Sequence, residues 1–99
     1  MTTKSDTIEV TKQKLKKPGK YVVLLHNDDT TPMDFVMSIL IQIFRHTPEA
    51  AYELTMKIHN SHKAVVGSFY KEIAEEKTNL TIQVAAKAGF PLKATVEEE

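Results

Sequence analysis

The chain contains no cysteine and only three glycines among its 99 residues. Without cysteine it has no disulfide, no thiolate metal site and no cysteine nucleophile. With so few glycines, none of its loops resembles the glycine-rich loops that hold phosphate groups. No hydrophobic run approaches the ~18 to 20 residues that span a membrane. What is present is 41% apolar residues, enough for the modest core of one small domain.

Charge is balanced overall but is distributed unevenly. The formal net charge is zero, yet residues 1–20 hold six lysines against two acidic residues, a net charge of +4. This asymmetry indicates a flexible basic extension over residues 1–19, a domain over 20–96 and an acidic fringe over 97–99. Because the extension has no arginine and no interleaved aromatic residues, we expect no nucleic-acid partner.

The first residues carry no recognisable targeting signal. They lack the apolar segment of a secretory signal, and Asp6 and Glu9 disfavour a transit peptide. Together with the absence of cysteine, this predicts a cytoplasmic protein with no membrane partner, and we expect it to be a monomer.

Three segments read as β-strands. The apolar, β-rich run at 21–26 indicates a central strand, and the runs at 64–69 and 92–96 indicate two more. Gly67 lies inside the second of these, which indicates a bulge or a close approach of the backbone. With helices between the strands, the order is β-α-α-β-α-β, and the fold class is α+β, a single two-layer α/β sandwich.

Three helices are predicted from start and stop signals. Thr31 is the expected N-cap of the first, with Pro32 at its first position, and Thr47 repeats this signal for a second helix that runs to about His59. The third spans 70–88 and ends at Gly89. The hydrophobic stripes predict the buried positions as Phe35, Val36, Ile39, Leu40, Ile43 and Phe44, then Ala51, Leu54, Thr55 and Ile58, then Ile73, Leu80 and Val84.

The loop between the first strand and the first helix is the most informative segment. Asn27, Asp28 and Asp29 place three polar side chains beside the apolar Met33. Such a loop suits a small cation, either a metal or an ammonium group. The spacing does not match a calcium loop, and we expect neither a metal nor a cofactor. A free α-amino group carries three donors and a positive charge, and Asn27, Asp28 and His59 would supply three acceptors.

Simpler readings of the same loop stay open. The three polar residues also suit a plain turn or cap, and a metal site could draw on the same aspartates. Ser61 and Ser68 lie outside any nucleophile-elbow pattern, so we do not expect an enzyme.

The sequence resembles the ClpS family, the adaptors of the bacterial N-degron pathway, over roughly residues 18–96. The resemblance lies in the run HNDDTTPMDFV, in Ile58-His59 and in the strand KAVVG at 63–67. It implies the fold already predicted and a mobile N-terminal extension. It also implies a non-enzymatic adaptor that captures proteins beginning with Leu, Phe, Tyr or Trp. The resemblance further implies that the adaptor passes them to an AAA+ unfoldase of the ClpA or ClpC type, which feeds ClpP.

The resemblance also assigns roles to particular residues. Asn27, Asp28 and His59 match the positions that hold the α-amino group, and Asp29 matches a loop-supporting position. Glu72 and Lys77 match positions that dock on the unfoldase N-domain. The apolar pocket for the N-terminal side chain is implied at Leu25, Thr31, Met33, Val36, Thr55 and Ile58.

Thr55 is a departure from the family pattern, because members commonly carry Met there. Thr is smaller, so we expect a wider pocket that also admits Ile or Val. The alternative function is a protein-interaction module of the same fold that does not recognise an N-terminal amine.

Overall fold

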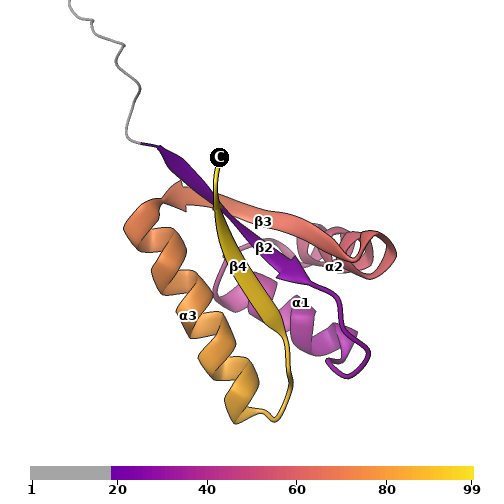
Figure 1. Cartoon of the computed structure of the whole chain (residues 1–99). Helices are drawn as coiled ribbons and strands as arrows, with labels where there is room; N and C mark the ends of the chain where they lie inside the picture. The colour runs from indigo at the N-terminus through magenta and orange to yellow at the C-terminus, as the bar shows by residue number, and fades with distance from the viewer. Residues whose placement is uncertain (1–18) are drawn as a thin grey trace, which may run out of the picture.

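The computed structural model describes residues 19–99 (Figure 1). The predicted order β-α-α-β-α-β is confirmed, and the predicted extension lies outside the described residues except for Gly19. Among residues 19–99, no helix has both the length and the apolar character that a membrane crossing requires. The elements are β2 (Lys20–His26), α1 (Met33–Gln42), α2 (Pro48–Ser61), β3 (Lys63–Tyr70), α3 (Lys71–Lys87) and β4 (Lys93–Glu98).

The three strands form one antiparallel sheet in the order β3-β2-β4, so β2 is the central strand. Side chains alternate between the faces of a strand. Val23 and Leu25 point to the side where the helices pack, and both are fully buried in the core. The two-layer sandwich follows, with the sheet as one layer and the helices as the other (Figure 1).

The pairing of β2 with β3 contains a bulge beside Gly67. Val23 pairs with Gly67 and Leu24 with Val65, so Val66 is the extra residue on β3. A Cβ on Gly67 would lie 2.6 Å from the ring of Phe69. Both features predicted for this glycine, a bulge and a close approach, are therefore present.

Strand β4 runs further than the predicted strand at 92–96. Glu97 pairs with Val22 and Glu98 with Tyr21, and the amide of Glu99 donates a 3.0 Å hydrogen bond to the Lys20 carbonyl. Residues 97 and 98, which we placed in an acidic fringe, thus belong to the sheet.

The N-cap predicted at Thr31 is wrong. Pro32 occupies that position in an extended conformation, and no side chain caps α1. The Thr31 hydroxyl donates instead to Oδ2 of Asp28 at 2.8 Å. The N-cap predicted at Thr47 is confirmed. Its hydroxyl accepts a hydrogen bond from the Ala50 amide at 3.2 Å, and α2 begins at Pro48.

The buried face predicted for α3 is also wrong in part. Ile73 and Leu80 are 43% and 45% exposed, and only Val84 of the three predicted residues is half-buried. The buried stripe consists of small side chains, which let the helix lie close to the sheet that it covers. Its members are Ala74, Thr78, Thr81 and Ala85. The predicted end is confirmed, since Gly89 has a φ of +86° and the Phe90 amide donates to the Ala85 carbonyl at 2.8 Å.

Candidate functional site

The β2–α1 loop is organised around the carboxylate of Asp28. Oδ1 accepts hydrogen bonds from the amides of Thr30 at 2.8 Å and Thr31 at 2.7 Å. Oδ2 accepts the Thr31 hydroxyl at 2.8 Å. A short polar side chain that bonds to the backbone just ahead of it is a common means of shaping a tight turn. The turn is thus built on Asp28, and the carboxylate is held in one orientation.

These bonds also set the charge of the site. Burial alone would raise the pKa of Asp28, but the hydrogen bonds from Thr31 and Thr30 outweigh it, so the pKa lies below its ordinary value of 3.8. Hydrogen bonds to the ionised form of a carboxyl group favour that form. Asp28 is therefore an anion at neutral pH, at a half-buried position in the loop.

Asn27 ties the loop to the end of α2. Its amide donates a 2.7 Å hydrogen bond to the carbonyl of His62, which ends α2 in a left-handed conformation with a φ of +74°. His59 lies in the last turn of the same helix. The side chains of Asn27 and His59 are both exposed. The loop and the helix end that carry the three predicted amine ligands therefore meet at one edge of the sheet.

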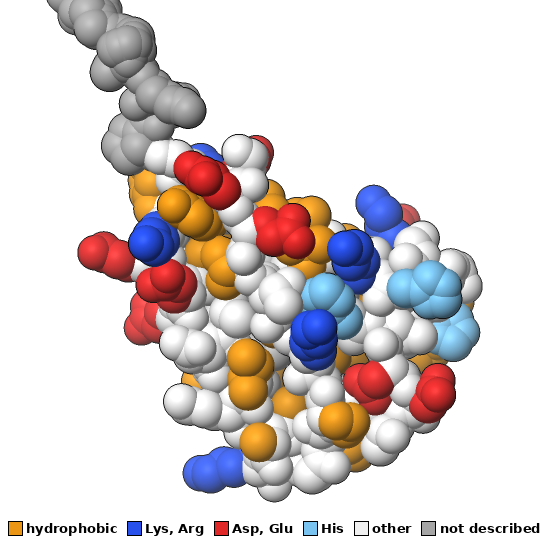
Figure 2. Space-filling model, viewed as in Figure 1, with side chains coloured by type: hydrophobic (Ala, Val, Ile, Leu, Met, Phe, Trp, Pro, Cys, Tyr) orange, Lys and Arg blue, Asp and Glu red, His pale blue; other side chains and the backbone are white. Residues whose placement is uncertain are grey.

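On the face drawn in Figure 2, acidic and histidine side chains gather at the edge of the molecule where the β2–α1 loop and the end of α2 lie. Asp29 is exposed in this loop. Among residues 19–99, no three His, Asp or Glu side chains come together in a way that would hold a metal ion. The ionised carboxylate of Asp28 and the exposed side chains of Asn27 and His59 are groups that can accept hydrogen bonds from a cation.

The six predicted pocket residues differ in their accessibility. Leu25, Val36 and Ile58 belong to the core cluster and are 0 to 6% exposed. Thr55 is 3% exposed, and its hydroxyl has no hydrogen-bond partner. Thr31 is half-buried, whereas Met33 is 40% exposed at the start of α1. Four of the six are therefore buried among core residues, and Met33 lies at the surface at the start of α1.

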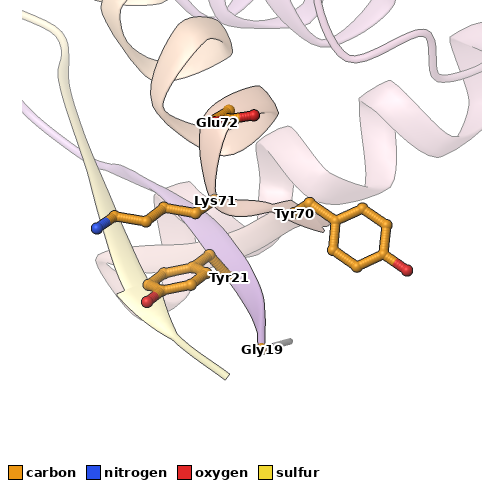
Figure 3. A pocket seen from close by; sticks show the side chains of 5 residues that line it. All are labelled: Gly19, Tyr21, Tyr70, Lys71 and Glu72. Atoms are coloured by element: carbon orange, nitrogen blue, oxygen red, sulfur yellow. The ribbon is translucent and has the colours of Figure 1, made fainter. Parts of the chain in front are cut away.

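The two predicted docking residues lie on α3, away from the loop. Glu72 is exposed in the first turn and lines a cavity of about 420 Å³ with Gly19, Tyr21, Tyr70 and Lys71 (Figure 3). Lys77 is less free. Its ammonium group donates to the Ile43 carbonyl at 2.7 Å and lies 5.4 Å from the centre of the Phe69 ring. Lys77 therefore also joins α3 to the turn that follows α1.

Sequence reasoning missed two parts of the site. The amide of Thr30 is a partner of Asp28, and the carbonyl of His62 anchors Asn27. Both are backbone groups, whose partners depend on the folded path of the chain. A left-handed residue just past the end of a helix is a recurrent way to end it, but glycine is the usual signal, and here the residue is histidine.

Known proteins resemble this chain in sequence and in fold. The profile of the family described as the ATP-dependent Clp protease adaptor protein ClpS matches residues 16–95. The chain belongs to the ClpS family. A ClpS adapter protein from Lawsonia intracellularis is 45% identical over 86 residues, which cover 87% of this chain and 79% of the relative. One from Campylobacter jejuni is 44% identical over 96 residues, which cover 97% of this chain and 98% of the relative.

A solved structure agrees with these sequence relatives. It is Agrobacterium tumefaciens ClpS2 bound to L-phenylalaninamide, which superposes with a TM-score of 0.81 at 37% identity. The match covers 84% of this chain and all of that one. The protein is thus a ClpS-type adaptor of the Clp protease, in which the loop built on Asp28 is the candidate site.

Proposed function

We propose that this protein is a cytoplasmic adaptor that captures other proteins by their N-terminal residue. The cargo begins with Leu, Phe, Tyr or Trp, and it is delivered to an AAA+ unfoldase of the ClpA or ClpC type for degradation by ClpP. The observation that carries this proposal is the fixed, ionised carboxylate of Asp28, next to the exposed Asn27 and the helix end that bears His59.

The α-amino group of the cargo binds to Asn27, Asp28 and His59. An N-terminal ammonium group offers three donors, and these side chains offer an amide oxygen, a carboxylate and an imidazole nitrogen. Hydrogen bonds to a charged group contribute about 1.5 to 3 kcal/mol each. A residue inside a chain has no free amine, so this contact restricts recognition to the first residue. Asp29 supports the loop from its exposed position.

The side chain of that first residue enters the apolar pocket on the core side of the loop. Its floor is formed by Leu25, Val36 and Ile58, its rim by Thr31 and Met33, and Thr55 borders it on α2. Burying a leucine or phenylalanine side chain contributes about 1.5 to 3 kcal/mol. The Agrobacterium ClpS2 structure supports the pairing of both contacts, because L-phenylalaninamide is a phenylalanine with a free α-amino group.

The unfoldase N-domain docks on α3 through Glu72 and Lys77, with the adaptor as a monomer. Glu72 is exposed and suits a contact with a partner. Family membership supports a Clp unfoldase as this partner, because the relatives share the description of Clp protease adapter.

The decisive test is fluorescence anisotropy with a labelled peptide that begins with Phe, beside the same peptide with an acetylated N-terminus. Binding of the free amine alone supports the proposal, because acetylation removes the charge and two of the three donors. Equal binding of the two peptides, or binding of neither, refutes it. In that case the same fold serves as an interaction module without amine recognition.

A further inference from the structure

Three basic side chains form a line across the sheet next to the loop. His26 of β2 pairs with Lys63 of β3 on one side and with Lys93 of β4 on the other. Residues opposite one another in neighbouring strands project from the same face. In Figure 2, a histidine side chain over the sheet is flanked by lysine side chains. We call Lys63, His26 and Lys93 the cationic row.

The cationic row lies on the face that the helices leave uncovered. Leu25 is fully buried on the core side, and because neighbouring side chains alternate, His26 points to the opposite face. Lys63 and Lys93 are exposed there, and His26 is half-buried. The row is therefore open to a partner from solvent.

The cationic row borders the proposed amine site directly. His26 precedes Asn27 in the chain, and Lys63 follows His62, whose carbonyl accepts the Asn27 amide at 2.7 Å. A cargo whose amine is held by Asn27 and Asp28 would begin next to this row, and the residues that follow its first residue are the ones within reach of the lysines. Neighbouring strands lie about 4.8 Å apart, so the row is about 10 Å long, which equals about three residues of an extended peptide.

The row concentrates positive charge without an acidic residue in the same line. The Nε2 atom of His26 is 2.8 Å from the Thr95 hydroxyl. The pKa of His26 is lowered, first by burial and then by the charges of Lys93 and Lys63, while Glu97 acts weakly in the opposite direction. Both lysines thus lie close enough to His26 to disfavour its protonated form, and their exposed ammonium groups can pair with carboxylates. The next row across the sheet is less charged, with Leu24 opposite Val65 and Thr95.

We propose that the cationic row reads the residues just behind the N-terminal residue of the cargo and favours Asp or Glu at its second to fourth positions. This inference rests on the proposed function. It adds a preference that depends on the cargo's charge to a site that selects the first residue by its amine and its apolar side chain.

The test compares three labelled peptides that begin with Phe and carry Glu, Gln or Lys at positions two to four. The proteins are the wild type, the Lys63→Gln/Lys93→Gln double variant and a control of equal charge, Lys57→Gln/Lys87→Gln, whose residues are exposed on α2 and α3. At low salt the wild type and the control should bind the Glu peptide about two- to fivefold more tightly than the Gln peptide, as exposed ion pairs do. The row variant should bind these two peptides equally.

Each other outcome has a distinct meaning. If the wild type binds the Glu and Gln peptides equally but still rejects acetylated peptides, the inference is overturned and the proposed function stands. If the row variant weakens all three peptides by the same factor, the lysines shape the loop rather than contact the cargo, and the inference is again overturned. If no peptide with a free N-terminus binds, the proposed function fails, and the inference fails with it.

Discussion

Asp28 holds Thr31 by both oxygens of its carboxylate: Oδ1 accepts the Thr31 amide at 2.7 Å, and Oδ2 accepts the Thr31 hydroxyl at 2.8 Å. The carboxylate is therefore in position before a ligand arrives. Binding groups that are already ordered do not have to be immobilised when the complex forms, which favours affinity. The pair thus holds a negatively charged group in a fixed position in the turn that follows β2.

Replacing Asp28 by Asn tests whether this carboxylate binds the peptide. The substitution keeps the shape of the side chain but removes the charge, so we expect the affinity for a Phe peptide to fall about tenfold or more. Thr31→Val, which removes one of the bonds that orient the carboxylate, should cause a smaller loss. Asp34→Asn is the matched control, because Asp34 is exposed in the first turn of α1. Unchanged binding by Asp28→Asn in an anisotropy titration would contradict the role of this carboxylate.

The pH dependence of binding is a test of Asp28. The pKa of Asp28 is lowered, so its carboxylate stays ionised until the pH falls below its ordinary value of 3.8, and it contributes no change in binding between pH 7 and 5. We therefore expect the ratio of the wild-type affinity to the Asp28→Asn affinity to stay constant in peptide titrations from pH 7 to 5, and to fall only as the pH drops through the lowered pKa of Asp28. A ratio that falls toward one between pH 7 and 5 would contradict the lowered pKa.

The role of His59 is tested at a single pH. His59→Gln should bind the Phe peptide more weakly at pH 7 in an anisotropy titration, while the neighbouring His62→Gln should bind it as the wild type does. Wild-type affinity in His59→Gln would contradict the role of His59 in holding the amine.

The loop shows why the sequence predicted a polar turn before α1 but not the hydrogen bonds within it. Asp and Thr are both favoured at N-caps and in turns, since either side chain can bond to a nearby backbone group. Thr31 stands directly before Pro32, which is a standard start signal. The choice between a cap and a turn depends on the path of the chain from β2, which local sequence does not specify. The place of the loop between β2 and α1 was therefore predicted correctly, and the hydrogen-bond partner of Thr31 was not.

Helix α3 shows a different limit. The large apolar residues Ile73 and Leu80 were predicted to lie on its buried face. The buried stripe lies one position further along the chain, at Ala74 and Thr81. Both stripes repeat at helical spacing, so periodicity alone cannot separate them. Which of the two stripes is buried depends on how closely the helix lies on the sheet, and this is a property of the tertiary fold. The central strand and the helix signals at Thr47 and Gly89 were predicted correctly because their causes are local.

Thr55 is expected to set the range of cargo. Methionine at this place would fill the space next to a branched side chain, so Thr55→Met should weaken binding of peptides that begin with Ile or Val about tenfold while Phe and Leu peptides keep their affinity. An unchanged ranking of first residues would rule out this role for Thr55.

Thr55→Val is the control for size. It keeps the volume, so the ranking of first residues should stay as in the wild type. It also removes a buried hydroxyl that has no partner, which should raise the free energy of unfolding by roughly 1 kcal/mol in urea titrations. Thr81→Val should show no such gain, because the Thr81 hydroxyl donates to the Lys77 carbonyl at 2.8 Å.

Gly67 is expected to be required for the packing of β3 rather than for binding. In Gly67→Ala the new Cβ would lie 2.6 Å from the Phe69 ring, which itself packs beside Phe44 with ring centres 6.2 Å apart. Overpacking of this kind typically costs about 1 to 3 kcal/mol. Gly19→Ala should cost nothing comparable, since its nearest neighbour would be 3.6 Å away. If Phe69→Leu fails to restore part of the stability lost in Gly67→Ala, the clash is not the cause.

Substitutions of Glu72 and Lys77 are expected to differ in their effect on the stability of the fold, although both residues are proposed to contact the unfoldase. Glu72 is exposed, so Glu72→Ala should leave thermal stability and peptide affinity unchanged and weaken only the complex with a purified ClpA or ClpC N-domain. Lys77→Ala should weaken that complex and also destabilise the fold, because the Ile43 carbonyl loses its charged donor. Glu75→Ala, on the same helix and exposed, is the control. Calorimetric titration of the N-domain together with thermal unfolding separates the two effects. If Glu72→Ala binds the N-domain as the wild type does, the docking surface lies elsewhere, and a loss confined to Lys77→Ala is a consequence of its bond to Ile43.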